Sequence, residues 1–185
     1  VPAGENSPLV TFFDSSYADC PDTRRSTVGS ITFLWGAAID WRSKLYRRVT
    51  TASNKAEYCA GSQAIQRAKA SHNILYALAI VTRSMPMIMY TDSNGAFGMI
   101  NNPGPRPNSR QMDVIEHLLR QTETSGETVT KLISSADNPA DLMTKCLSST
   151  THEKHTRSYL QVAPQTLNFL KPPTTDPLLG AASRR

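Results

Sequence analysis

The chain has 185 residues, of which 39% are hydrophobic, and it carries a formal net charge of +5. This length and composition suit one globular domain with a sizeable core and some additional tail. No apolar run approaches the roughly 18 residues that a membrane-spanning helix needs, so we expect no membrane partner. A basic domain often binds a polyanion, although solubility alone would explain the charge equally well.

The start of the chain lacks the basic and apolar regions of a signal peptide. Cys20, Cys59 and Cys146 are odd in number, lie far apart and lack metal-ligand spacing. These features predict free thiols in a reducing compartment.

Three apolar runs near the N-terminus predict an antiparallel sheet. Residues 1–8 show no periodicity and are expected to form a leader. Residues 9–13 then predict a strand that ends at Asp14, and residues 27–35 and 39–46 predict two more. The links between these strands are short, so consecutive strands should pair as an antiparallel meander.

A long helix is expected after these strands, over residues 54–83. Small apolar residues recur there at helical spacing, which would let the helix pack closely on a sheet. Ser53 precedes this segment and can serve as its N-cap. Glu57 lies near the start of the helix, one turn before Gly61, so its carboxyl group can lie near the packed face.

The apolar run over residues 87–91 predicts a short buried strand that ends at Asp92. Ser93 and Asn94 can then cap a helix that runs to Ile100. Open α/β sheets bind ligands at the carboxyl ends of their strands, which is where Asp92 would lie. The simpler interpretation, that Asp92 only caps the helix, stays open from the sequence alone.

The rest of the chain alternates polar segments with short periodic ones. The expected elements are, in order, a Pro-rich loop at residues 101–110, a helix over 112–119 that Gly126 ends, a strand over 129–133, a helix that starts within 134–139 and continues through 140–145, and a short helix over 150–160. Pro, Thr, Ser and Gly dominate after that point, so we expect a flexible tail over residues 161–185. These elements predict one domain over residues 9–160.

This order of elements turns scattered acids into a candidate site. Asp14 and Asp92 would lie side by side if the first and fourth strands are parallel neighbours, while Glu57 and Asp141 would approach from helices. Converging carboxylates need a cation, because like charges in a partly dry site otherwise bind protons. Mg²⁺ and Mn²⁺ prefer oxygen ligands. Two such ions, about 4 Å apart, can hold an attacking water and a leaving oxygen on either side of a phosphorus atom.

Four blocks of sequence contain these four acids. Residues 14–29 include D-S-S-Y-A-D and R-R-S-T-V-G, and residues 41–58 include W-R-S-K and S-N-K-A-E-Y. Residues 90–96 are Y-T-D-S-N-G-A, and residues 140–145 are A-D-L-M-T-K. In order and spacing they resemble blocks of the ribonuclease H domains of copia-type retrotransposon polyproteins, namely D-A-D-W-A with R-R/K-S-T-S-G, W-S-S-K with S-S/T-x-E-A-E-Y, C-D-N-Q/K-S-A, and A-D-I-L-T-K.

The resemblance implies the ribonuclease H fold, an α/β domain. Its five-stranded mixed sheet, with three antiparallel strands followed by two parallel ones, would be flanked by helices. The resemblance also implies that Asp14, Glu57, Asp92 and Asp141 are the catalytic acids and the ligands of two Mg²⁺ or Mn²⁺ ions.

The implied activity is endonucleolytic hydrolysis of the RNA strand of RNA–DNA hybrids during reverse transcription of a retrotransposon. Water would be the nucleophile in this two-metal-ion reaction. The implied partner, besides the hybrid, is a reverse transcriptase domain of the same polyprotein. The implied location is intracellular, in a cytoplasmic virus-like particle or the nucleus.

Further polar residues flank the acids in the sequence and are candidates for contact with the hybrid. Basic side chains would contact phosphates, which dominate the affinity for nucleic acids, and small polar ones could bind 2′-hydroxyl groups. A solvated basic rim and helix capping are the simpler roles for these residues. The candidates are Ser16, Arg24, Arg25, Lys44, Arg47, Arg48, Ser93 and Asn94.

Two other functions stay open. Lys55, Arg106 and Gln111 depart from the family pattern, which leaves room for a catalytically weak or inactive module that binds nucleic acid or protein. An integrase-type strand transferase shares the fold, but such enzymes use three acids and lack the A-D-x-x-T-K block, so this function ranks lower. Cleavage of a hybrid in the presence of magnesium separates the hydrolase from the binding module.

Overall fold

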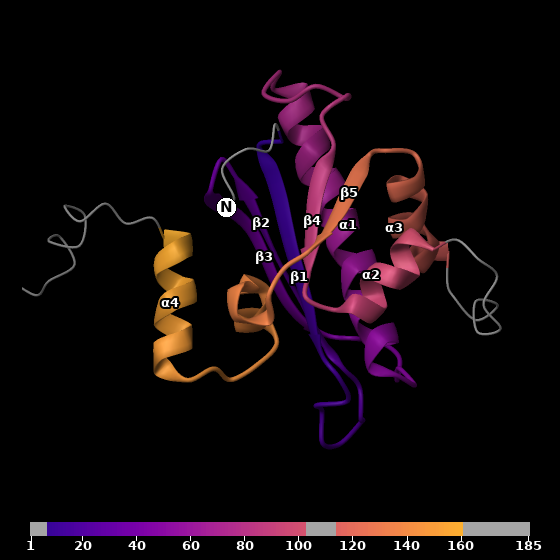
Figure 1. Cartoon of the computed structure of the whole chain (residues 1–185), viewed down its shortest axis with the longest axis vertical. Coiled ribbons are helices and arrows are strands. Elements are labelled where there is room, and N and C mark those ends of the chain that lie inside the picture. Colours follow the sequence, from indigo (N-terminus) through magenta and orange to yellow (C-terminus); the bar gives the residue numbers. More distant parts are fainter. Residues whose placement is uncertain (1–6, 103–113, 161–185) are drawn as a thin grey trace, which may run out of the picture.

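A five-stranded mixed sheet lies at the centre of the computed structural model, which describes residues 7–102 and 114–160 (Figure 1). Its strands are β1 (Leu9–Ser16), β2 (Thr27–Leu34), β3 (Ala37–Leu45), β4 (Met87–Thr91) and β5 (Thr128–Leu132). They lie in the order β3-β2-β1-β4-β5, with β1 antiparallel to β2 and β2 antiparallel to β3. Strand β4 is parallel to both β1 and β5. The mixed sheet predicted from the sequence is therefore confirmed.

Helices cover both faces of this sheet. The elements are α1 (Ser53–Ala77), α2 (Asn94–Asn101), α3 (Val114–Thr124) and α4 (Ser149–Leu160), with two 3₁₀ turns, η2 (Ser135–Asp137) and η3 (Pro139–Met143). Helices α1, α2 and α3 lie on one side of the sheet, and η3 and α4 lie on the other (Figure 1). Within the described ranges, no helix is both long enough and apolar enough to cross a membrane. Most of the expected leader, most of the Pro-rich loop and the expected tail fall outside those ranges.

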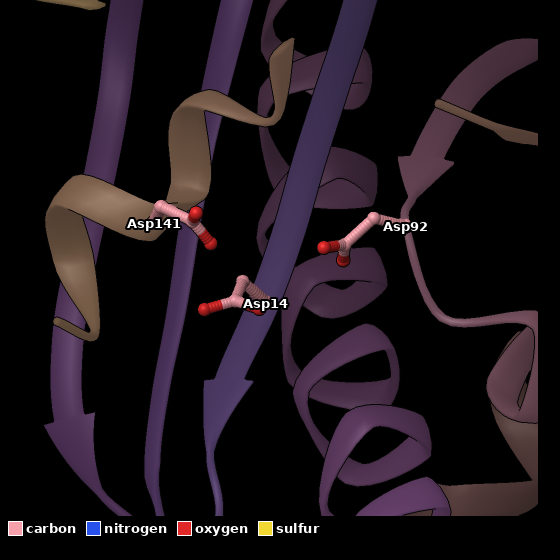
Figure 2. A group of neighbouring side chains, drawn as sticks. All are labelled: Asp14, Asp92 and Asp141. Atoms are coloured by element: carbon pink, nitrogen blue, oxygen red, sulfur yellow. The ribbon is translucent and has the colours of Figure 1, made fainter. Parts of the chain in front are cut away.

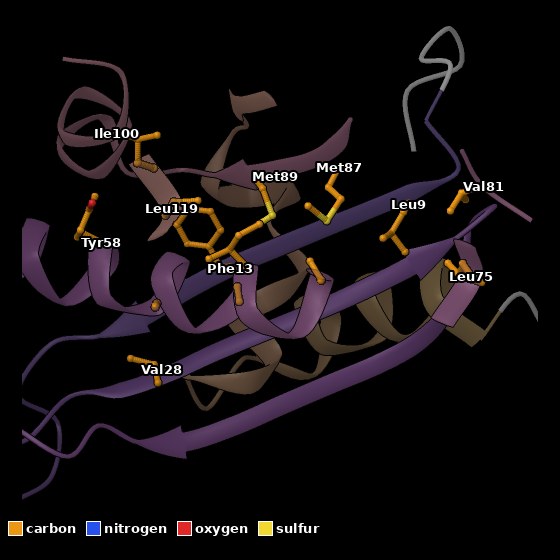
Figure 3. Packing of buried hydrophobic residues seen from close by; sticks show 14 residues of the cluster. Leu9, Phe13, Val28, Tyr58, Leu75, Val81, Met87, Met89, Ile100 and Leu119 are labelled. Atoms are coloured by element: carbon orange, nitrogen blue, oxygen red, sulfur yellow. The ribbon is translucent and has the colours of Figure 1, made fainter. Parts of the chain in front are cut away.

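The central strand β1 is buried on both faces because its side chains alternate between them. Leu9 and Phe13 join the core beneath α1, together with Met89 of β4 (Figure 3). Val10 and Phe12 join a second core on the opposite face, beneath η3. The end of β1 consequently lies in surroundings from which water is largely excluded.

Helix α1 differs from the prediction at both ends. Its N-cap is Ala52, which makes no side-chain capping bond, so the prediction that Ser53 caps it is wrong. The helix ends at Ala77 instead of near residue 83. Ala79 adopts a left-handed conformation with φ of 57°, and the N–H of Ile80 donates back to the last helical turn at 2.9 Å. This is the Schellman ending, in which glycine normally takes the left-handed position.

Two local predictions about the acidic segments also need correction. The helix expected over residues 134–145 is replaced by the turns η2 and η3. Ser93, and not Asp92, is the N-cap of α2, because its Oγ accepts a hydrogen bond from the N–H of Ala96 at 3.1 Å. The interpretation of Asp92 as only a helix cap is therefore wrong.

Candidate active site

Three aspartates from different elements meet where β1 and β4 end (Figure 2). Asp14 lies on β1, Asp92 directly follows β4, and Asp141 lies in η3. One carboxylate oxygen from each lies within 4.8 Å of the corresponding oxygens of the other two. In the parallel pairing, Phe12 lies opposite Tyr90. The same register carries Asp14 to the level of Asp92, which is why two residues so distant in the sequence lie side by side.

Gly29 allows η3 to approach the sheet closely enough to bring in the third aspartate. It lies opposite Asp14 in the antiparallel pairing of β1 and β2. A Cβ atom at Gly29 would lie 2.6 Å from Cβ of Met143 and 2.7 Å from Cγ2 of Thr144. Since real Cβ atoms do not approach other carbons so closely, only glycine lets η3 rest on β2 at this point. The contact holds Asp141 over the end of β1.

Thr144 and Lys145 directly follow η3 and donate hydrogen bonds to the acids. The Thr144 hydroxyl donates to Oδ2 of Asp14. The ammonium of Lys145 donates to Oδ1 of Asp141 at 2.9 Å and to Oδ1 of Asp14 at 3.3 Å. The Asp14 side chain is 1% exposed and that of Lys145 is 40% exposed, so the ammonium approaches from the solvent side. Both residues belong to the A-D-L-M-T-K block, but the sequence alone predicts no role for them.

Asn138 and Ser135 hold Asp92 in place, and neither residue is predicted from the sequence to belong to the site. Asn138 is fully buried, and its Nδ2 donates to Oδ1 of Asp92 at 3.1 Å and to the carbonyl oxygen of Phe13 at 3.2 Å. Its Oδ1 accepts from the N–H of Ala140 at 3.2 Å. The Ser135 hydroxyl donates to Oδ2 of Asp92. A single amide thereby joins β1, the end of β4 and the start of η3.

Glu57 lies close enough to Asp14 and Asp92 to feel their charges, although its oxygens are not among those within 4.8 Å of one another. It is buried on α1, and its Oε2 has no hydrogen-bond partner in the described part of the chain. Burial, followed by repulsion from Asp14 and Asp92, raises the pKa of Glu57 to about 8. Burial also raises the pKa of Asp14 to about 6, while the hydrogen bond from Thr144 and the charge of Lys145 oppose that rise. The cluster thus favours bound protons in the absence of another cation.

The donor set of this cluster fits a hard divalent cation. All its potential ligands are carboxylate oxygens, which Mg²⁺ and Mn²⁺ prefer over nitrogen or sulfur. One of these oxygens, Oε2 of Glu57, is buried and has no hydrogen-bond partner among residues 7–102 and 114–160, whereas buried polar atoms are almost always satisfied. A cation would supply both the missing partner and the missing positive charge.

The residues expected to contact nucleic acid lie around this end of the sheet. Asp14 pairs with Gly29 and Gly29 with Ser43, so Lys44 lies one residue beyond the level of the acids on the edge strand β3. Ser16 ends β1, Ser93 caps α2, and both are half-buried.

The remaining candidates for nucleic-acid contact are mostly exposed. The exposed ones are Arg24, Lys44, Arg47, Arg48 and Asn94. Arg25 is half-buried, and its Nε donates to the hydroxyl of Thr23 at 3.1 Å. Their placement is compatible with a rim around the acids, and their contacts with nucleic acid stay a prediction.

Solved structures with the same arrangement of elements are ribonucleases H. LC11-RNase H1, isolated from compost by a metagenomic approach, superposes with a TM-score of 0.56 at 14% identity, over 75% of this chain and 93% of that one. The structure of LC11-RNase H1 in complex with an RNA/DNA hybrid superposes with a TM-score of 0.51 at 15% identity, over 74% and 93% of the two chains. The chain therefore has a ribonuclease H-like fold.

By sequence, the chain is similar to one region of two much longer polyproteins. It is 28% identical over 142 residues, 77% of its length, to the retrovirus-related Pol polyprotein from transposon TNT 1-94 of Nicotiana tabacum. It is 29% identical over 151 residues, 81% of its length, to the corresponding polyprotein from transposon RE1 of Arabidopsis thaliana. The chain matches 10% of the length of each of these relatives. No family model matches the sequence. The chain is therefore similar to one region of the Pol polyproteins of such retrotransposons.

Proposed function

We propose that this domain is a metal-dependent ribonuclease H that hydrolyses the RNA strand of RNA–DNA hybrids. The observation that carries the proposal is the convergence of Asp14, Asp92 and Asp141, with Glu57 beside them, in a ribonuclease H-like fold. Four carboxyl groups gathered in this way would be unfavourable for a purely structural site, because their mutual repulsion and burial oppose folding. A reaction that needs divalent cations explains why they are together.

The carboxylates of Asp14, Glu57, Asp92 and Asp141 would hold two Mg²⁺ or Mn²⁺ ions. When bound, such ions lower the pKa of an attacking water and stabilise the leaving oxygen of the phosphodiester. The protein's own groups keep the ligands in place: Asn138 fixes Asp92 against the end of β1. No side chain forms a covalent bond with the substrate, and the products would carry 3′-hydroxyl and 5′-phosphate ends.

Binding of a metal ion at the acidic cluster is coupled to the release of protons. Glu57, whose pKa is raised to about 8, holds a proton at neutral pH in the absence of a cation. It has to lose that proton before it can act as a ligand, since ligands bind in their deprotonated form. Loading of the site should therefore release protons and should strengthen as the pH rises.

Residues outside the acidic cluster would bind the substrate. Basic residues on the rim, namely Arg24, Arg25, Lys44, Arg47 and Arg48, would neutralise phosphates. Ser16, Ser93 and Asn94 would bind the 2′-hydroxyl groups that distinguish RNA from DNA. The solved complex of LC11-RNase H1 with an RNA/DNA hybrid supports this choice of substrate. A reverse transcriptase domain of the same polyprotein would supply further grip.

The test is a cleavage assay with four duplexes of one sequence, each labelled on one strand. The RNA strand of the hybrid should be cut in Mg²⁺ and left intact when a chelator removes the metal. The DNA strand of the hybrid, double-stranded RNA and double-stranded DNA should remain intact. Retained hybrid binding without any cleavage would instead identify a catalytically inactive binding module.

A further inference from the structure

The ammonium of Lys145 already occupies a cation position in the acidic cluster. It donates to Oδ1 of Asp141 and to Oδ1 of Asp14, which belong to two of the three carboxylates that converge. A divalent cation held by these two acids would have to bind the same carboxyl groups. The ammonium and the cation would then lie only a few ångströms apart and would repel each other.

The backbone directs Lys145 to this position. Lys145 lies four residues after Asp141, and its N–H donates to the carbonyl oxygen of Asp141 at 2.9 Å. The tight turn that ends η3 therefore sends the side chain back toward the Asp141 carboxylate. Because the Lys145 side chain is 40% exposed, it can also leave the acids and point into solvent without crossing the core.

The charge of Lys145 persists at neutral pH. Burial alone would lower the pKa of its ammonium, but hydrogen bonds and attraction from Asp141 and Asp14 outweigh burial and raise that pKa above its ordinary value. The lysine is thus a permanent cation in the metal-free site, and its geometry stands independently of this shift.

We propose that Lys145 is a resident counter-cation that holds Asp14 and Asp141 together in the metal-free protein and competes with a divalent cation for them. This inference rests on the proposed metal site. Lys145 is a positioning residue in this account, because it acts through the acids and does not touch the substrate. Its competition sets how readily the half of the cluster next to η3 accepts a metal ion.

Three variants test the competition. Lys145→Gln removes the charge and keeps most of the side-chain length, and Lys145→Arg keeps the charge. Lys69→Gln is the control, since the Lys69 side chain is about as exposed as that of Lys145 and forms an ion pair with Glu127, which is no part of the acidic cluster. Calorimetry would measure the affinity for Mn²⁺ without nucleic acid, and thermal unfolding would measure stability in chelator.

Lys145→Gln should bind Mn²⁺ about tenfold more tightly than the wild type, the scale of one close charge at a partly exposed site. The same variant should unfold at a lower temperature in chelator, because Asp14 and Asp141 lose their counter-charge. Lys145→Arg and Lys69→Gln should bind Mn²⁺ as the wild type does. Metal binding by Lys145→Gln that equals or falls below wild-type binding would overturn this inference while leaving the metal site itself intact. Absence of binding in the wild type and in every variant would overturn the proposed function as well.

Discussion

Two buried carboxyl groups of the cluster, Asp14 and Glu57, are supplied with partners very differently. Asp14, next to η3, receives the Thr144 hydroxyl and the Lys145 ammonium. Glu57, on α1, leaves Oε2 without a partner among the described residues. The difference appears in the pKa values, which rise to about 6 for Asp14 and to about 8 for Glu57.

The contrast shows that the charge of Asp14 is balanced more fully than that of Glu57. On the η3 side, an ammonium provides the balance. On the α1 side, the Ser15 hydroxyl and the charge of Lys145 lower the pKa of Glu57 but do not offset the effect of burial, so a bound proton or a metal ion would provide the remaining balance. Such a site can form in the folded protein without metal and still favours the binding of a cation.

The charge of Asp92 acts on both halves of the cluster, because it helps to raise the pKa of Asp14 and that of Glu57. In Asp92→Asn the amide oxygen can still accept the hydrogen bond of Asn138, so the fold should survive. Its melting temperature without metal should equal or exceed that of the wild type, because one like charge is gone. Hybrid cleavage should fall by about three orders of magnitude or more, as expected for one member of a catalytic unit.

The measurement for Asp92→Asn is paired, with melting temperature and cleavage rate determined on the same preparations. Hybrid binding should persist, since it depends mainly on phosphate contacts. A folded variant that cleaves at nearly the wild-type rate would remove Asp92 from the catalytic set.

Gly29→Ala should disturb the η3 half of the cluster selectively. The added methyl group would collide with Met143 and Thr144, and overpacking of this kind costs about 1–3 kcal/mol. Displacement of η3 should also separate Asp141 from Asp14 and lower cleavage. Gly98→Ala on α2 is the control, because a Cβ atom there meets no other atom within 4 Å. Denaturant unfolding of both variants checks the expectation, and equal stabilities would contradict the proposed close approach.

The pH dependence of the free energy of unfolding should reveal the contribution of Glu57, the acid on α1. The Glu57 carboxyl has a pKa of about 8 in the folded protein against 4.5 ordinarily, so the folded state binds its proton more tightly. Its contribution to stability is therefore complete below the lower value and is lost as the pH rises toward the upper one. At about 1.4 kcal/mol per pKa unit, the wild type should lose about 2 kcal/mol more than Glu57→Gln between pH 6 and pH 8 without metal.

The control for this comparison is Glu153→Gln, which removes a carboxylate from an exposed ion pair with Arg157 on α4. Its pH profile should follow that of the wild type. If Glu57→Gln also follows the wild type, the protonated state of Glu57 is not a feature of the folded protein.

The salt dependence of hybrid affinity should distinguish the contribution of the basic rim from that of the acidic cluster. Interactions among buried charges are weakly screened, whereas phosphate contacts release counterions, so hybrid affinity should fall steeply with salt. Replacing Arg47 and Arg48 with Ala should reduce the slope of log affinity against log salt by about 1–2 units. Arg157→Ala, on α4, should leave the slope unchanged. If the double variant keeps the wild-type slope, Arg47 and Arg48 belong to a solvated rim.

The sequence predicted the sheet well because alternating and continuous apolar runs report strands directly. It also predicted that Asp14 and Asp92 would be neighbours if the first and fourth strands paired in parallel, and the pairing of β1 with β4 meets that condition. The end of α1 was missed because the left-handed residue is Ala79 where glycine would have signalled a stop. The sequence predicts a helix in place of the turns η2 and η3, because segments of so few residues carry no usable periodicity.

The supporting contacts of the site could not be predicted, because they depend on tertiary structure. Asn138 reaches Phe13 across the fold, and nothing near either residue in the sequence signals this hydrogen bond. Lys145 did carry a local signal, its spacing of four residues from Asp141. That signal has meaning only once the turn after η3 is known to direct the side chain back to the acids.

We propose that the four carboxyl groups of the acidic cluster form one metal-binding unit. Anomalous diffraction at the manganese edge from crystals soaked in Mn²⁺ tests it most directly. We expect peaks enclosed by Asp14, Glu57, Asp92 and Asp141, with the Lys145 side chain displaced from its position between Asp14 and Asp141. A well-ordered structure with no peak between these four residues, or with peaks only elsewhere on the surface, would contradict it.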